Sequence, residues 1–127
     1  MSIILYNQLT NASGKKLNRI VKSIIPRGQI TTYQTIDEFS QGLRQSMNGY
    51  RIAVILAESR DELLKISELI DWSWNLRVIL ILPDHERETI SIGCKLHPRF
   101  TSYIDSNFNV VGAVLEKMFS NLNGNDY

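Results

Sequence analysis

Three short stretches of the sequence contain residue types that could do chemistry. The first is Gly14-Lys15, which follows an apolar segment as a phosphate-binding loop would. That motif needs another glycine five residues before Gly14 and a Ser or Thr after the lysine. Leu9 and Lys16 stand at those positions. The stretch therefore predicts an ordinary helix start, with Ser13 as the cap.

The second stretch is Asp84-His85-Glu86, whose side chains are all of types that bind metal ions. Adjacent residues in a turn rarely point at one ion, and the other histidine, His97, lies in a different loop. Asp84 is expected to cap the next helix, and Glu86 to favour its first turn. We therefore expect neither a metal ion nor a cofactor.

The third stretch contains Cys94, which follows a glycine and has no His or Asn partner nearby in the sequence. A free cysteine is usually a small buried hydrophobic residue without chemistry of its own. Ser59 is expected to cap a helix, and no pair of carboxylates stands out as general acid and base. The sequence therefore predicts a protein that is not an enzyme.

Five apolar segments alternate with five helical patterns and would position any site. Strands are expected at residues 2–6, 29–33, 51–57, 76–82 and 99–104, and helical periodicity covers residues 17–25, 36–47, 58–70, 86–92 and 111–122. Gly93 is expected to end the fourth helix. This alternation predicts one α/β domain over residues 1–127, with a frayed tail at 123–127. Its fold would be a flavodoxin-like three-layer sandwich with a five-stranded parallel sheet.

The burial of the strands predicts their order. The segments at 51–57 and 76–82 are apolar on both faces, as central parallel strands are. The second and fifth segments are more polar, as edge strands are. These features predict the strand order 2-1-3-4-5.

Composition narrows the class of protein. A net charge of +1 gives no case for nucleic-acid binding, and a single cysteine fits a reducing compartment. No apolar run approaches the roughly 20 residues that span a bilayer, and the first residues lack the features of a signal peptide. We therefore expect a cytoplasmic protein that binds neither nucleic acid nor membranes.

A parallel sheet of this order binds its ligands beyond the carboxyl ends of the strands. The loops there are residues 7–13, 57–59, 83–86 and 105–107. A small flavodoxin-like ligand-binding protein or enzyme would use the first of these loops together with Asp84 and His85. This alternative stays open at the level of the sequence.

The segment from the fourth strand to the last helix resembles the receiver domain of response regulators. It reads RVILILPD, then a short helix ending in IGCKL, then YID and SNF before the last helix. Receivers have a strand ending in Ser or Thr, a helix ending in Gly-Ala and a strand ending in Lys-Pro-Phe. Gly93-Cys94 matches Gly-Ala, and Phe108 matches the final Phe. The order of elements extends the resemblance over nearly the whole chain.

The residues that carry phosphorylation in receivers are absent from the matching positions. Asn7 and Gln8 stand in place of the acidic pair that binds Mg²⁺, and Ala57 or Glu58 stands in place of the phosphoacceptor Asp. The Ser or Thr is replaced by Leu82 or Pro83, and the Lys by Asp105 or Ser106. The resemblance therefore implies a pseudo-receiver, a signal-transduction protein that is not phosphorylated and acts by binding proteins. Glu58 at the acceptor position could also imitate a charged state.

The resemblance also implies where a partner would bind. Receivers often form dimers or bind partners through the fourth helix, fifth strand and fifth helix, which here correspond to residues 86–95, 100–105 and 110–122. Arg and aromatic residues are enriched at protein interfaces. The candidate contacts, for a protein partner or a homodimer, are His97, Arg99, Phe100 and Tyr103, with Trp72 and Trp74 as a second group.

Overall fold

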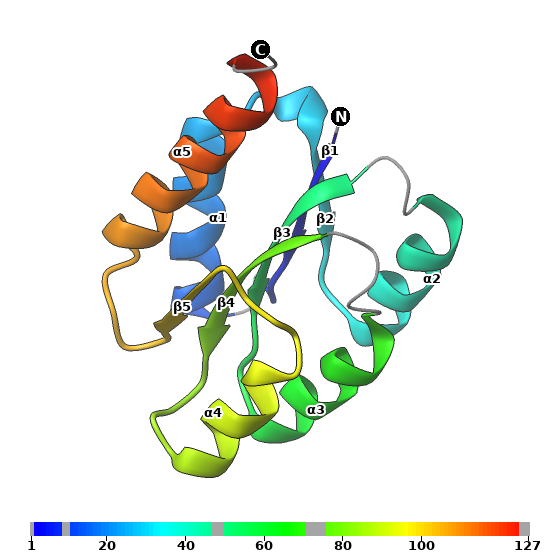
Figure 1. Ribbon diagram of the computed structural model, residues 1–127, viewed down its shortest axis with the longest axis vertical. Helices are drawn as coiled ribbons and strands as arrows, with labels where there is room; N and C mark the ends of the chain where they lie inside the picture. The colour runs from blue at the N-terminus through cyan, green and yellow to red at the C-terminus, as the bar shows by residue number, and fades with distance from the viewer. Residues whose placement is uncertain (1, 9–10, 47–49, 71–75, 125–127) are drawn as a thin grey trace.

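A parallel sheet with helices on both faces forms the protein (Figure 1). The computed structural model describes residues 2–8, 11–46, 50–70 and 76–124. The strands within these ranges are β1 (Ser2–Tyr6), β2 (Ile30–Tyr33), β3 (Tyr50–Leu56), β4 (Arg77–Leu82) and β5 (Phe100–Tyr103). All strand pairs are parallel, and the order β2-β1-β3-β4-β5 confirms the predicted fold class and strand order.

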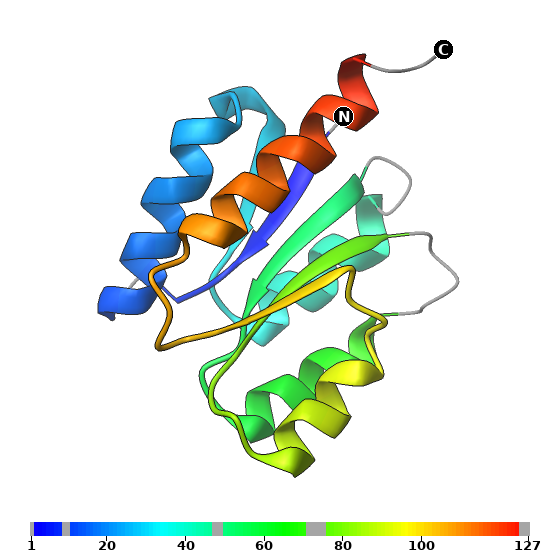
Figure 2. The same ribbon diagram turned by 60° about the vertical axis from the view of Figure 1, so that its left-hand side comes forward.

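The helices of the described residues form two layers. They are α1 (Ala12–Ile24), α2 (Ile36–Ser46), α3 (Arg60–Leu69), α4 (Arg87–Cys94) and α5 (Asn109–Gly124), with a short 3₁₀ turn at Arg27–Gln29. Helices α1 and α5 cover one face of the sheet, and α2, α3 and α4 cover the other (Figure 2). None of the described helices is long and apolar enough to cross a membrane.

Successive residues of the central strands face opposite layers. On β3, Ala53 and Ile55 pack with the α2–α4 layer, whereas Ile52 and Val54 pack with the α1–α5 layer. All four are fully buried. A strand covered on both faces has no polar side, which is why β3 and β4 are continuous apolar runs in the sequence.

The helix cap predicted at Ser59 is confirmed, and Thr35 caps a second helix in the same way. The Ser59 hydroxyl accepts a hydrogen bond from the backbone N–H of Glu62 (3.1 Å), and the Thr35 hydroxyl accepts one from that of Glu38 (3.1 Å). In each case a side-chain oxygen satisfies an N–H group that the first helical turn leaves free. These caps fix the starts of α3 and α2.

The predictions for the starts of α1 and α4 were wrong in detail. Asn11, not Ser13, caps α1, since its Oδ1 accepts a hydrogen bond from the N–H of Gly14 (2.8 Å). Residue Glu86 is the N-cap of α4 without a side-chain capping bond, whereas Asp84 accepts a hydrogen bond from the N–H of Glu86 (2.9 Å). Asp84 therefore holds the turn before the helix and does not cap the helix itself.

The prediction that Gly93 ends the fourth helix was also wrong, because α4 continues through it to Cys94. A Cβ atom at Gly93 would lie 3.0 Å from a methyl group of Leu80 and 3.1 Å from one of Leu82. This glycine therefore allows the helix to approach β4 closely. The exposed position of Cys94 differs from the burial that is usual for a free cysteine.

Gly14 brings the start of α1 against the end of β1. A Cβ atom there would lie 1.7 Å from the backbone carbonyl oxygen of Gln8, whereas a Cβ at Gly28 meets nothing within 4 Å. We predict that Gly14→Ala lowers the free energy of unfolding by about 2–3 kcal/mol, as overpacking against backbone does. Urea denaturation followed by circular dichroism measures this. The control Gly28→Ala should change stability little, and equal losses in both variants would contradict the assignment.

Candidate functional site

The carboxyl ends of β1 and β3 lie side by side, as the sequence predicts for the site of such a fold. Tyr6 of β1 is in register with Ile55 of β3. The residues that follow these strands, including Gln8 and Glu58, therefore come together above the first turn of α3. We call Tyr6, Gln8, Asn11, Glu58 and Glu62 the strand-end cluster.

Glu62 is the centre of the strand-end cluster. Its Oε2 accepts hydrogen bonds from the Tyr6 hydroxyl (2.7 Å) and from Nε2 of Gln8 (3.0 Å). Its Oε1 accepts a hydrogen bond from the backbone N–H of Glu58 (2.8 Å). One carboxylate on α3 therefore binds the end of β1, the loop after it and the end of β3.

The second carboxylate of the cluster, that of Glu58, is also held by a neighbour. The Nδ2 of Asn11 donates a hydrogen bond to its Oε2. Because Oδ1 of Asn11 caps α1 at the same time, this amide links the charge on Glu58 to the start of that helix. Both carboxylates of the cluster are therefore engaged by groups of the protein itself.

Asn7 is turned into the protein and does not face solvent. It is fully buried, and its Nδ2 donates a hydrogen bond to the carbonyl oxygen of Gly14 (2.8 Å). Its backbone N–H donates to the carbonyl oxygen of Tyr33 (3.1 Å). Its Oδ1 is buried without a hydrogen-bond partner among the described residues. The side chain that replaces an acidic residue of receivers therefore braces the β1–α1 connection.

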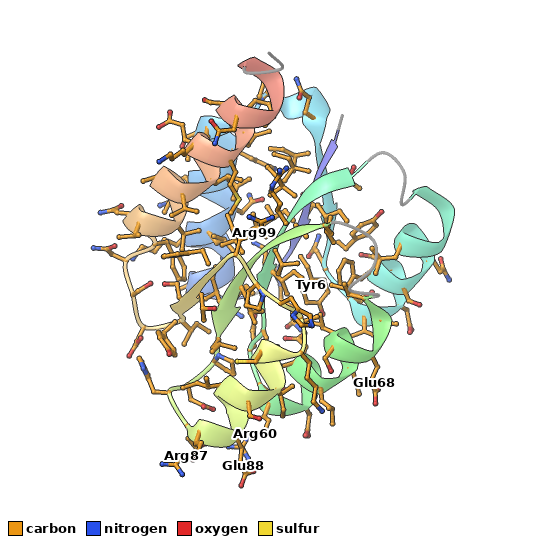
Figure 3. The ribbon with its side chains drawn as sticks, in the orientation of Figure 1. Tyr6, Arg60, Glu68, Arg87, Glu88 and Arg99 are labelled. Atoms are coloured by element: carbon orange, nitrogen blue, oxygen red, sulfur yellow. The ribbon has the colours of Figure 1, made fainter. Side chains whose placement is uncertain are left out.

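The phenol of Tyr6 is kept protonated by its surroundings. Burial raises the pKa of Tyr6 above its ordinary value, and the hydrogen bond to Glu62 and the negative charges of Glu62 and Glu58 raise it further. The ring is fully buried and packs against that of Phe39, with 5.0 Å between the centroids. Figure 3 shows Tyr6 in the interior of the molecule. Tyr6 is therefore a fixed hydrogen-bond donor.

One of the two positions predicted for the phosphoacceptor and one of the two predicted for the Ser or Thr lie in the core. Ala57 is 0% exposed, its N–H donates to the carbonyl oxygen of Ile81 (3.1 Å), and it packs with the α2–α4 layer. Leu82 is buried in the same cluster, and the Pro83 that follows it is half-buried. Glu58 is the first residue after β3 with a partly exposed side chain.

The other two strand-end loops are tied to each other. The Nε2 of His85 lies 3.2 Å from Oδ2 of Asp105, and the His85 ring stacks on that of Tyr103, with 3.7 Å between centroids and 15° between planes. His85, which a ligand-binding protein of this fold was expected to use together with Asp84, is thus engaged in local contacts.

Hydrogen bonds from Thr89 and from the backbone N–H of Glu86 hold the pKa of Asp84 below its ordinary value. Ser106, the alternative position for the receiver lysine, shares a hydrogen bond with Ser102 (3.1 Å).

A shallow hollow of about 420 Å³ opens beside the strand-end cluster. It is lined by Gln8, Ile36, Glu58, Ser59, Asp61, Glu62 and Lys65. Three carboxylates against one lysine make it acidic, so it suits a cation better than a phosphate-bearing cofactor. Across the ranges that the structure describes, no three His, Cys, Asp or Glu side chains are arranged to hold a metal ion.

Two of the residues predicted to contact a partner, Phe100 and Tyr103, pack on opposite faces of the sheet. Phe100 and Tyr103 are both half-buried, but Phe100 packs with the α1–α5 layer and Tyr103 with the α2–α4 layer. His97 and Arg99 are exposed, and His97 has a left-handed backbone with φ of 49°. Trp72 and Trp74 lie outside the described residues.

Sequence reasoning missed the partners that hold the site together. It did not single out Tyr6, Asn11 or Glu62 as residues of the site. The spacing Ser59-x-x-Glu62 is the available signal, since it is that of a capping box whose Glu reaches back to a backbone N–H. Here the Glu62 carboxylate reaches one residue further, to Glu58. Arg60, also missed, pairs with Glu86 (2.7 Å) and Glu88 (2.9 Å) and so joins α3 to α4.

Removal of the Tyr6 hydroxyl tests the cluster. We predict that Tyr6→Phe lowers the free energy of unfolding at neutral pH by about 1–2 kcal/mol, since Glu62 loses a buried donor. The control Tyr103→Phe removes a hydroxyl without a hydrogen-bond partner among the described residues and should change stability by less than about 0.5 kcal/mol.

The pH dependence supplies the second readout of that substitution. Because the pKa of Tyr6 is raised from an ordinary value of 10.0, its stabilising effect is fully present below pH 10 and declines as the pH rises above it. Urea midpoints on both sides of pH 10 should therefore fall more steeply for the wild type than for Tyr6→Phe. Identical slopes would contradict a protonated, buried Tyr6.

Solved structures from two bacteria share this architecture. A protein of Burkholderia pseudomallei K96243 described as related to pilus assembly matches with a TM-score of 0.60 and 17% identity, over 92% of this chain and 88% of that one. The signal receiver domain of the response regulator NarL from Mycobacterium tuberculosis matches with a TM-score of 0.56 and 11% identity, over 91% and 94%. No family model and no curated protein matches the sequence. The chain therefore has the receiver-like fold, and identities this low speak to the fold alone.

Proposed function

We propose that this chain is a receiver-fold signalling module that acts by binding other proteins and is not an enzyme. In this proposal, no aspartyl phosphorylation switches it. The observation that carries the proposal is the closed hydrogen-bond network of the strand-end cluster. Where a receiver would carry out phosphoryl transfer, Glu62 and Glu58 accept hydrogen bonds from the protein, and Ala57 is part of the core.

The chemistry of phosphoryl transfer explains why this network argues against it. Transfer to a carboxylate needs a free nucleophile, a divalent cation to neutralise charge and a cation to hold the product. Mg²⁺ prefers charged oxygen ligands, whereas the side chains after β1 are the amides Asn7 and Gln8. Those amides already donate to Gly14 and Glu62. The side chains that would have to release their hydrogen bonds to bind Mg²⁺ are therefore engaged in holding the fold together.

Treatment with acetyl phosphate and Mg²⁺ tests the absence of phosphorylation. We predict no phosphoryl adduct by intact-mass spectrometry, because Ala57 offers no nucleophile and both cluster carboxylates are engaged. A receiver domain that retains its aspartate, treated in parallel, should gain one adduct.

A stoichiometric adduct on this chain would contradict the proposal. Glu58→Gln then identifies the acceptor, since an adduct on Glu58 disappears in that variant. The same variant tests whether the charge of Glu58 locks one conformation. An unchanged amide spectrum and unchanged self-association in Glu58→Gln would exclude such a lock.

A small ligand-binding protein is the alternative function, supported by the hollow of about 420 Å³ beside Glu58 and Glu62. Its acidic lining opposes the phosphate of a flavin, and Gly14 packs against the carbonyl of Gln8 where a phosphate-binding loop would need space. The alternative therefore requires a cationic ligand. The contact network of the cluster favours the signalling module.

For the protein contact, we propose the face made by α4, β5 and α5, used by a partner or by a second copy of the chain. Val110, in the first turn of α5, has a side chain that is 59% exposed. Leu64 on α3 is the other exposed large hydrophobic residue of the described ranges, at 40%. The buried core of an interface is more apolar than the rest of the protein surface, so exposed apolar side chains favour contact at this face. One of the two similar structures is described as related to pilus assembly and the other as a signal receiver domain. Because these roles differ, we propose only that the partner is a protein.

Substitution of Val110 tests this face. We predict concentration-dependent self-association in sedimentation equilibrium, and a dissociation constant raised about tenfold or more in Val110→Glu, which is about 1.4 kcal/mol. A glutamate is tolerated there because the first turn of a helix favours negative charge. The control Leu64→Glu introduces the same charge on α3 and should leave association unchanged. A monomer at all concentrations, or equal effects of both variants, would argue against a homodimer on this face.

A further inference from the structure

A second hollow, of about 370 Å³, lies at the amino ends of β4 and β5. The strand-end cluster lies at the other end of the strands. It is lined by Arg77, Arg99, Val114, Lys117, Met118 and Asn121. We call it the basic hollow, because three of its six lining residues are cationic and none is acidic. Figure 3 shows Arg99 on the side of the sheet that α5 covers.

The fold forces the two arginines together. Arg77 is the first residue of β4, and Arg99 directly precedes β5. The backbone N–H of Arg99 donates to the carbonyl oxygen of Val78 (2.8 Å), which places Arg99 beside the start of β4. The two positive side chains are therefore attached to the backbone at the starts of two paired strands.

Helix α5 supplies the other side of the basic hollow. Val114, Lys117, Met118 and Asn121 stand at positions i, i+3, i+4 and i+7 of the helix, so they lie along one face of it. Lys117 therefore adds a third positive charge to the lining of the basic hollow, and Asn121 adds an amide. Val114 and Met118 provide apolar surface between these polar groups, and both pack against the core.

The three cations of the basic hollow have no acidic partner within the part of the chain that the structure describes. There, Arg60 pairs with Glu86 and Glu88, and His85 contacts Asp105. Among the described residues, these like charges therefore repel one another. An anion bound between them would relieve the repulsion.

We propose that the basic hollow binds a small phosphate ester. A phosphate monoester carries about two negative charges at neutral pH, which three cations match better than they match a single carboxylate. The guanidinium groups of Arg77 and Arg99 can each donate two hydrogen bonds to phosphate oxygens, with Lys117 as a point charge beside them. The apolar side chains Val114 and Met118 would contact the organic part of the ester. The volume lies within the range of small-molecule sites.

The basic hollow is part of a wider excess of positive charge on the α1–α5 layer, although the net charge of the whole chain is only +1. Helices α1 and α5 carry a single acidic residue, Glu116, and five basic ones: Lys15, Lys16, Arg19, Lys22 and Lys117. A positive field over this layer raises the local concentration of anions. The same field could attract the phosphates of lipids or nucleic acid, which the test must separate from a small ester.

Titration with AMP, followed by amide chemical shifts, tests the proposal. We expect saturable shifts at Arg99 and along the Val114–Asn121 face, with a dissociation constant below about 1 mM. Inorganic phosphate should shift the same amides more weakly, and adenosine should not shift them. Arg77→Gln and Arg99→Gln should each weaken AMP binding about tenfold or more. The control Arg87→Gln removes an equal charge from α4, away from Arg99 in Figure 3, and should leave binding unchanged.

Three results would overturn the proposal. The first is no shift with AMP or inorganic phosphate at about 10 mM. The second is AMP binding that survives Arg77→Gln and Arg99→Gln in protein with an unchanged urea midpoint. The third is binding to phosphatidylglycerol vesicles or to a short DNA duplex that is lost in Lys15→Gln/Arg19→Gln but kept in Arg99→Gln, with AMP unbound. That outcome would assign the positive charge to a surface on α1 instead.

Discussion

The carboxylate of Glu62 joins three segments that are distant in the sequence, and the arrangement of the strand ends depends on it. Its partner Tyr6 lies 56 residues away and its partner Gln8 lies 54 residues away. Without this carboxylate, a fully buried phenol and the backbone N–H of Glu58 would lose their acceptor, and each unsatisfied buried group costs about 1–3 kcal/mol. The charge at the start of α3 is therefore part of the fold, and this limits what else the strand ends can do.

The same constraint extends over all four strand-end loops. Asn11 holds Glu58 while it caps α1, and His85 connects the β4–α4 loop to Asp105 and Tyr103. In a phosphorylation site, such groups would be left available for a metal ion and a phosphoryl group. Here the carboxylates of Glu58, Glu62 and Asp105 are engaged by side chains of the protein itself. A module of this kind would take its input through contacts elsewhere, such as the α4–β5–α5 face or the basic hollow around Arg99.

The fold could be predicted from the sequence because it depends on local patterns. Continuous apolar runs such as Ile52–Leu56 indicate strands buried on both faces, and Ser59 before Asp61 and Glu62 indicates a helix start. The cluster could not be predicted, because Tyr6 and Glu62 meet only through the register of β1 and β3. Gly93 was misread for a similar reason, since a glycine that ends a helix and one that lets a helix approach a strand look alike in sequence.

The central claim is that the strand ends are closed by internal contacts and do not bind the ligands of a phosphorylation site. Its most direct test is an NMR titration with Mg²⁺ and then beryllofluoride, which imitates a phosphoryl group. The account predicts no saturable shift at the amides of Asn7, Ala57 and Glu58, because Glu62 and Asn11 occupy the groups that would have to respond. Saturable shifts at these three amides would contradict it and would mean that the site still works as a switch.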